Sequence, residues 1–90
     1  MSGCLHITVK GRVQGVAFRA NTRRQAMKMN IRGFVRNIPS GDVEILAIGE
    51  QESLQQLITW CHKGPLLAKV SDVIVNEHHS GEDFESFHIR

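Results

Sequence analysis

The sequence has few features of an extracellular or membrane protein. It contains only two cysteines, Cys4 and Cys61, which lie far apart and in no C-x-x-C motif, so we expect isolated thiols and no disulfide framework. No apolar run approaches the roughly 18 residues needed to span a bilayer. The first residues also lack the basic segment and apolar stretch of a secretory signal. We therefore expect a cytoplasmic protein with no membrane partner.

Metal-ligand patterns and clustered aromatic residues are also scarce. The chain has four phenylalanines, one tryptophan and no tyrosine. Its histidines are scattered, and the adjacent pair His78 and His79 has no third residue at ligand spacing, so we expect no metal site. Neither cysteine has a recognisable histidine partner, which argues against a cysteine nucleophile.

Negative charge is absent from the first half of the chain. Residues 1–41 hold eight Lys or Arg and no acidic residue, whereas residues 42–90 hold three basic and nine acidic residues, which gives net charges of +8 and −6. Such a field attracts anions to the first half. The alternative for Arg23, Arg24 and Lys28 is a solvated basic helix face. A chain of 90 residues is expected to form one domain, residues 1–90.

Hydrophobic periodicity predicts the order of the secondary-structure elements. The expected strands are residues 4–10, 33–38, 43–48, 70–76 and 84–90, and the expected helices are residues 19–30 and 51–63. The turn at 39–42 joins two strands in a hairpin, and a second turn is expected at 80–83. This order predicts an α+β fold, a ferredoxin-like βαββαβ sandwich with two helices on one face of an antiparallel sheet.

A glycine-punctuated loop precedes the first predicted helix. Residues 11–19 read GRVQGVAFR, and glycines at both Gly11 and Gly15 allow the backbone to turn several N–H groups toward one point. The helix N-terminus adds partial positive charge, and Arg19 adds a bidentate cation. The loop has neither the Walker pattern nor the dinucleotide pattern. It predicts a different cradle for a tetrahedral dianion such as phosphate.

A carboxamide near the end of the second predicted strand completes the candidate site. Residues 33–43 read GFVRNIPSGDV, with Asn37 in their middle and Gly49 further along. In the predicted fold the first and second strands lie within reach of each other, so Asn37 could project toward an anion held by residues 14–19.

These two segments resemble the signatures of acylphosphatases. The stretches at 9–19 and 33–49 match in register, and so do GPLLAKV at 64–70 and FHIR at 87–90. The resemblance implies the ferredoxin-like fold and hydrolysis of small acyl phosphates without a metal or cofactor. It also implies that Arg19 binds the phosphate and that Asn37 positions the attacking water. The implied phosphate-binding loop is the backbone of Gln14, Gly15, Val16, Ala17 and Phe18.

The chemistry suits this small set of residues. An acyl phosphate is a mixed anhydride with a weakly basic leaving carboxylate, so no strong general acid is required. Asn37 can orient water but is too weak a base to ionise it. We therefore expect the rate of hydrolysis to change little over the pH range in which histidine side chains ordinarily titrate. Many acylphosphatases carry a threonine that helps orient the asparagine amide at the position of Ile38, where this chain departs from the family.

Other functions remain open at this stage. The fold could present RNA-binding strands, although the clustered strand aromatics of such sheets are missing. The chain could also be a catalytically silent module that binds phosphate or a protein. We expect a monomer that acts on a small acyl phosphate and binds no nucleic acid. The sequence does not name the acyl group.

Overall fold

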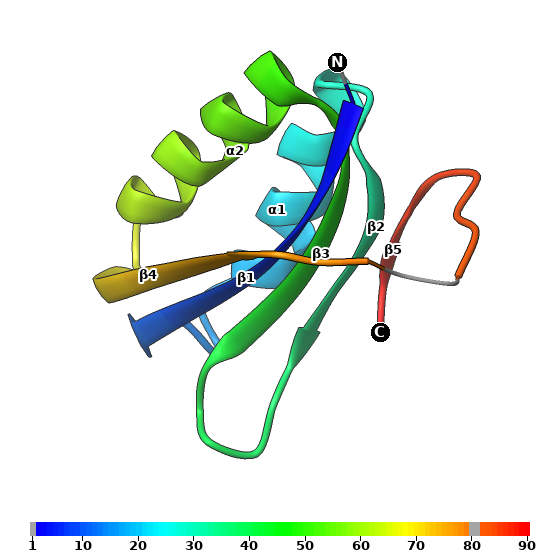
Figure 1. Cartoon of the computed structure of the whole chain (residues 1–90). Helices are drawn as coiled ribbons and strands as arrows, with labels where there is room; N and C mark the ends of the chain where they lie inside the picture. The colour runs from blue at the N-terminus through cyan, green and yellow to red at the C-terminus, as the bar shows by residue number, and fades with distance from the viewer. Residues whose placement is uncertain (1, 80–81) are drawn as a thin grey trace.

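Two helices cover one face of a five-stranded sheet (Figure 1). The computed structural model describes residues 2–79 and 82–90, so the turn predicted at 80–83 lies partly outside the described residues. The elements are β1 (Ser2–Arg12), α1 (Phe18–Lys28), β2 (Arg32–Asn37), β3 (Val43–Glu50), α2 (Gln51–Lys63), β4 (Lys69–Glu77) and β5 (Phe87–Ile89). The predicted order and type of the elements and the two-layer sandwich are confirmed.

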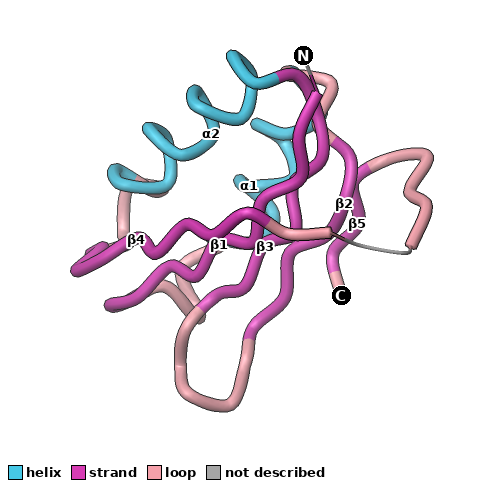
Figure 2. The backbone as a smooth tube through the Cα atoms, in the orientation of Figure 1, coloured by secondary structure: helices cyan, strands magenta, loops and turns pink. Residues whose placement is uncertain are grey.

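The sheet is mixed, with the strand order β4-β1-β3-β2-β5 (Figure 2). The pairs β1–β3, β1–β4 and β2–β3 are antiparallel, as expected. The short strand β5 instead pairs in parallel with β2, from Gly33 opposite Phe87 to Val35 opposite Ile89. Backbone hydrogen bonds at both ends of this pairing fix β5 at the sheet edge: the Gly33 amide donates to Ser86 and the Arg90 amide donates to Val35.

Strand β1 extends further toward the glycine loop than predicted. It continues to Arg12, with a register shift between Lys10 and Gly11 where it pairs with β4. Gly11 has φ 119°, and a Cβ there would clash with the backbone carbonyl of Lys69. Gly11 therefore serves strand packing, and the loop before α1 is limited to residues 13–17.

Helix α1 begins one residue earlier and ends two residues sooner than the sequence predicts. Its inner face buries Phe18, Thr22 and Ala26 against the sheet. The Thr22 hydroxyl donates to the Phe18 carbonyl at 2.8 Å, so its burial leaves no unpaired donor. The helix stops at Lys28 because Asn30 adopts a left-handed conformation with φ 56°.

Helix α2 spans the predicted residues, 51–63. It buries Leu54, Leu57 and Cys61, and Gly64 follows it with φ 68°. Its Trp60 ring packs on Phe18 with ring centroids 5.3 Å apart, which joins the two helices beside the start of α1. No helix in the described part of the chain is long and apolar enough to cross a bilayer.

The core has two parts, one on each face of the sheet. The larger lies under the helices and includes Ile7, Val35 and Ile45. The smaller, Phe34, Leu46 and Phe84, lies on the opposite face, where the chain before β5 folds back over the sheet. The connection to β5 therefore covers part of the face that the helices leave open, before β5 reaches the edge next to the candidate site.

Candidate active site

The loop at residues 13–17 turns sharply into α1. Gly15 has φ 74° and Ala17 has φ 61°, two left-handed residues within three positions. Within residues 2–79 and 82–90 no side chain caps the start of the helix, and the first helical hydrogen bond runs from the Asn21 amide to the Ala17 carbonyl at 3.1 Å. The amides of the first turn consequently have no acceptor within the helix. They can donate to an anion at the positive end of the helix dipole.

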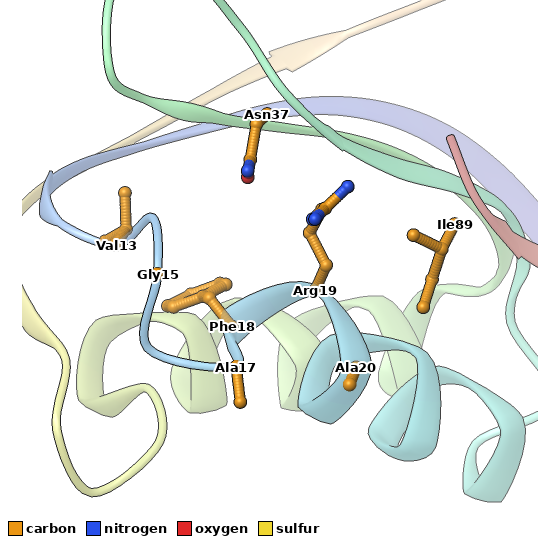
Figure 3. A pocket seen from close by; sticks show the side chains of 8 residues that line it. All are labelled: Val13, Gly15, Ala17, Phe18, Arg19, Ala20, Asn37 and Ile89. Atoms are coloured by element: carbon orange, nitrogen blue, oxygen red, sulfur yellow. The ribbon is translucent and has the colours of Figure 1, made fainter.

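A pocket of about 190 Å³ lies in front of this helix end (Figure 3). It is lined by Val13, Gly15, Ala17, Phe18, Arg19, Ala20, Asn37 and Ile89. These residues come from the loop and α1, from the end of β2 and from β5. The fold thus brings Arg19 and Asn37, the two predicted site residues, to one pocket.

Arg19 is the one charged residue among those that line the pocket. Its side chain is half-buried, and Nη1 donates to the Arg90 backbone oxygen at 3.3 Å. Among the described residues, no Asp or Glu is ion-paired with Arg19. Its charge is therefore available to an anion, while the contact with residue 90 holds the guanidinium at the pocket wall.

Asn37 ends β2 and projects over the pocket from the side opposite α1 (Figure 3). Its side chain is exposed and takes part in no hydrogen bond among the described residues. Both the amide oxygen and the amide N–H groups are thus free to bind water or substrate. Strands β1 and β2 are not neighbours, because β3 lies between them, so the loop after β1 must reach across the end of β3.

Gln14 spans this gap. Its Nε2 donates to the carbonyls of Ile38 and Asp42, each at 2.9 Å. The same two residues close the β2–β3 turn through a backbone hydrogen bond of 3.0 Å from the Ile38 amide to the Asp42 carbonyl. The Gln14 side chain therefore links the loop to the turn that follows Asn37. Hydrophobic periodicity in the sequence does not predict this contact.

The loop residues predicted to bind phosphate divide into two groups. Gly15, Ala17 and Phe18 line the pocket, whereas Gln14 and Val16 do not. Val16 is half-buried and packs against the main core. The sequence analysis missed Val13, Ala20 and Ile89 as pocket residues, because their apolar side chains carry no chemical signal.

Two carboxylates, Asp42 at the β2–β3 turn and Glu44 on β3, are paired with groups outside the pocket. Hydrogen bonds from Lys10, at 2.8 Å, and Ser40 hold the pKa of Asp42 below its ordinary value. Burial raises the pKa of Glu44, but hydrogen bonds from His6 and Arg36 outweigh it and lower the pKa overall. Neither acid lines the pocket.

The residues that line the pocket include no histidine, cysteine or carboxylate. In the described ranges 2–79 and 82–90, no group of three or more His, Cys, Asp or Glu residues is placed to hold a metal ion. The arrangement offers one cation, several backbone donors and one amide. It can bind an anion and orient a neutral molecule beside it.

Comparison with known proteins shows the family to which this chain is similar. The family model described as Acylphosphatase matches residues 5–89. The chain is 43% identical over 84 residues to an acylphosphatase of Geobacter sulfurreducens, covering 93% of this chain and 92% of the relative. It is 49% identical over 73 residues to one of Nitrosococcus oceani, covering 81% and 82%. A solved acylphosphatase structure from Coxiella burnetii superposes with a TM-score of 0.93 at 42% identity, covering 99% of this chain and 93% of the other.

Proposed function

Because this chain belongs to the acylphosphatase family and is an enzyme that hydrolyses acyl phosphates, we propose how its pocket performs the reaction. The loop at 14–18 and Arg19 hold the phosphoryl group, and Asn37 positions the attacking water. The observation that carries this proposal is the placement of Arg19 and Asn37 on opposite sides of one pocket, which no other charged side chain of the described residues lines.

The phosphoryl group binds where donors and positive charge converge. The planar Arg19 guanidinium can hold two phosphoryl oxygens at once. Backbone amides at the start of α1 can hold the remaining oxygen without reorganising, since none is capped by a side chain. Preorganised donors of this kind typically stabilise a transition state by about 3–4 kcal/mol each.

The water is oriented rather than ionised. The Asn37 oxygen accepts a hydrogen bond from water and holds it in line with the phosphorus atom. Phosphoryl transfer through a loose transition state needs mainly positioning and charge stabilisation. The substrate phosphate accepts the proton, and the leaving carboxylate needs no acid. Because no titratable side chain with an ordinary pKa near neutrality lines the pocket, the rate should vary little between pH 6 and 8.

The first test is hydrolysis of benzoyl phosphate in the presence of EDTA. The parent should be active, and Arg19→Ala and Asn37→Ala should each lose about 10²-fold or more in kcat/KM, the usual effect of removing one transition-state donor. Asn76→Ala, an exposed asparagine on β4, is the matched control and should behave as the parent. Circular dichroism checks that the folds are intact. Full activity in both site variants would contradict the proposed roles.

We also propose that the enzyme acts as a monomer in the cytoplasm and binds no nucleic acid. Sedimentation at micromolar protein concentration tests whether the enzyme is a monomer. A salt titration of ligand binding tests for nucleic-acid binding, because nucleic-acid affinity falls steeply with ionic strength whereas the affinity for a phosphate-sized ligand falls mildly. An inactive parent that still binds inorganic phosphate would instead favour a silent binding module.

A further inference from the structure

The turn between β2 and β3 is joined to strand β1 by a side-chain ion pair. In the β1–β3 pairing Val9 lies opposite Val43, and the next residues along, Lys10 and Asp42, meet through their side chains. Lys10 Nζ donates to Asp42 Oδ2 at 2.8 Å, and the Ser40 hydroxyl donates to the same oxygen at 2.9 Å. The Asp42 side chain is only 13% exposed, so the pair holds one fixed position at the base of the turn.

The backbone of Asp42 connects this ion pair to the end of β2. Its carbonyl accepts hydrogen bonds from the Ile38 amide at 3.0 Å and from Gln14 Nε2 at 2.9 Å. Ile38 directly follows Asn37 in the chain. A displacement of Asp42 therefore reaches Asn37 through this backbone hydrogen bond and the peptide bond that joins Ile38 to Asn37.

Asn37 depends on this backbone anchor because its side chain has no partner among the described residues. The neighbouring side chains do not supply one: Ile38 has no donor or acceptor, and Arg36 is paired with Glu44. A displacement of about 1 Å in a reacting group can cost about 10²-fold in rate. The place of the Asn37 amide over the pocket is thus set by the backbone at the end of β2 and in the turn (Figure 3).

We propose that Lys10 and Asp42 are positioning residues for hydrolysis. Their ion pair holds the turn so that the Asn37 amide keeps the attacking water in line with the phosphorus atom. Neither residue lines the pocket, so both act through Asn37 and not on the substrate. The proposal rests on the proposed role of Asn37, and it adds a side-chain anchor on β1 to the backbone contacts that Gln14 makes with the same turn.

Positioning has to be separated from the electric field of the two charges. Through the field alone, loss of the Lys10 cation would weaken phosphate binding, whereas loss of the Asp42 carboxylate would strengthen it. Positioning predicts instead that both substitutions lower kcat alike and leave the affinity for phosphate nearly unchanged.

The test is a double-mutant cycle on benzoyl phosphate hydrolysis with Lys10→Met, Asp42→Ala and the double variant. Each single variant should lower kcat about fivefold while KM and the inhibition constant of inorganic phosphate change by less than about twofold. The double variant should be no slower than either single variant, because the two residues act as a unit. Lys10→Arg, which can donate to the same carboxylate, should restore kcat. Thermal unfolding followed by circular dichroism sets an assay temperature at which every variant is folded.

The Asn37→Ala background tests whether the ion pair acts through Asn37. Adding Lys10→Met to Asn37→Ala should cause no further loss in kcat, whereas a general loosening of the fold would lower it again. Arg36→Met is the matched control, because it removes an ion pair from the same hairpin that does not reach the turn. It should keep the parental kcat.

Parental kcat in Lys10→Met and Asp42→Ala would overturn the proposal, and so would losses that add in the double variant or an equal loss in Arg36→Met. If Asn37→Ala is slow in any of these cases, the proposed function still stands. If Asn37→Ala is as active as the parent, the proposed role of Asn37 fails, and the proposal for the ion pair fails with it.

Discussion

Arg19 combines charge and shape at the pocket wall. A lysine at this position keeps the positive charge but loses the fork that can hold two phosphoryl oxygens and the contact to the Arg90 oxygen. We expect Arg19→Lys to lose roughly 10²-fold in kcat/KM for benzoyl phosphate, close to the loss in Arg19→Ala. Steady-state kinetics and the inhibition constant of inorganic phosphate measure the effect. Activity within a few-fold of the parent would mean that charge alone suffices.

Gly15 is required for its backbone conformation. An added Cβ would meet no atom within 4 Å, but φ 74° is strained for any other residue, and Gly15 lines the pocket. We expect Gly15→Ala to cost about 1–2 kcal/mol of stability and to weaken phosphate binding. Gly41→Ala, with φ 95° and equally open space, is the matched control. It should show a similar stability loss with a smaller effect on phosphate affinity, as measured by calorimetry.

At the scale of elements, Gln14 joins the β1–α1 loop to the β2–β3 turn. Gln14→Met keeps the length of the side chain but leaves the Ile38 and Asp42 carbonyls without this donor. We expect a loss of about 1–3 kcal/mol in the free energy of unfolding. We also expect kcat to fall more than KM changes, because Asn37 would no longer be held in register with the loop. Denaturant titration and kinetics separate the two effects.

Gln55→Met, on the exposed face of α2, is the control for the Gln14 variant. It should leave both stability and kcat near the parental values. If Gln14→Met lost stability with no change in kcat, the link would support the fold without positioning Asn37.

The elements themselves were largely predictable. Apolar residues alternate at positions 5, 7 and 9, and Leu54, Leu57 and Cys61 recur at helical spacing. Both patterns arise because one face of each element is buried against the other layer, as in any two-layer fold. The ends of elements were less predictable. Helix α1 stops before Asn30 and β1 runs on to Arg12 because of backbone torsions and pairing with β4, which local pattern does not encode.

The site was predicted in part. The glycine loop and Asn37 carry strong local patterns, and their meeting follows from the topology. The hydrogen bonds from Gln14 to the β2–β3 turn and the place of Ile89 in the pocket lining bring together positions 24 or more residues apart. Local sequence spacing does not predict such contacts. The last strand was predicted, at 84–90, but it is shorter, Phe87–Ile89, and its parallel pairing with β2 was missed. That direction depends on the path of the chain over the far face of the sheet.

At the scale of the whole molecule, paired carboxylates set the response to acid. The pKa values of Asp42, Glu44 and Glu82 are lowered by their hydrogen-bonded partners. Groups with lowered pKa values stabilise the fold above the pKa values of the unfolded chain, which are 3.8 for Asp and 4.5 for Glu. This stabilisation is lost as the pH falls through the lower folded values. We therefore expect the free energy of unfolding to decrease below about pH 4.5.

Glu44→Gln tests this expectation. Removing the carboxylate should lower the stability at pH 7 by about 1 kcal/mol or less and should make the decrease at acid pH shallower. Thermal unfolding followed at several pH values measures both. If the free energy of unfolding of the variant decreased as steeply with falling pH as that of the parent, groups other than Glu44 would cause the acid sensitivity.

The pocket is built from chain segments that lie far apart in sequence, as the contact between Arg19 and residue 90 across 71 positions illustrates. Such contacts close late in folding because each encloses a long loop of disordered chain. Helical signal should return early after dilution from denaturant, while hydrolysis should return only when β5 docks beside β2. The rate at which hydrolysis recovers during refolding therefore measures the rate at which β5 docks at the sheet edge.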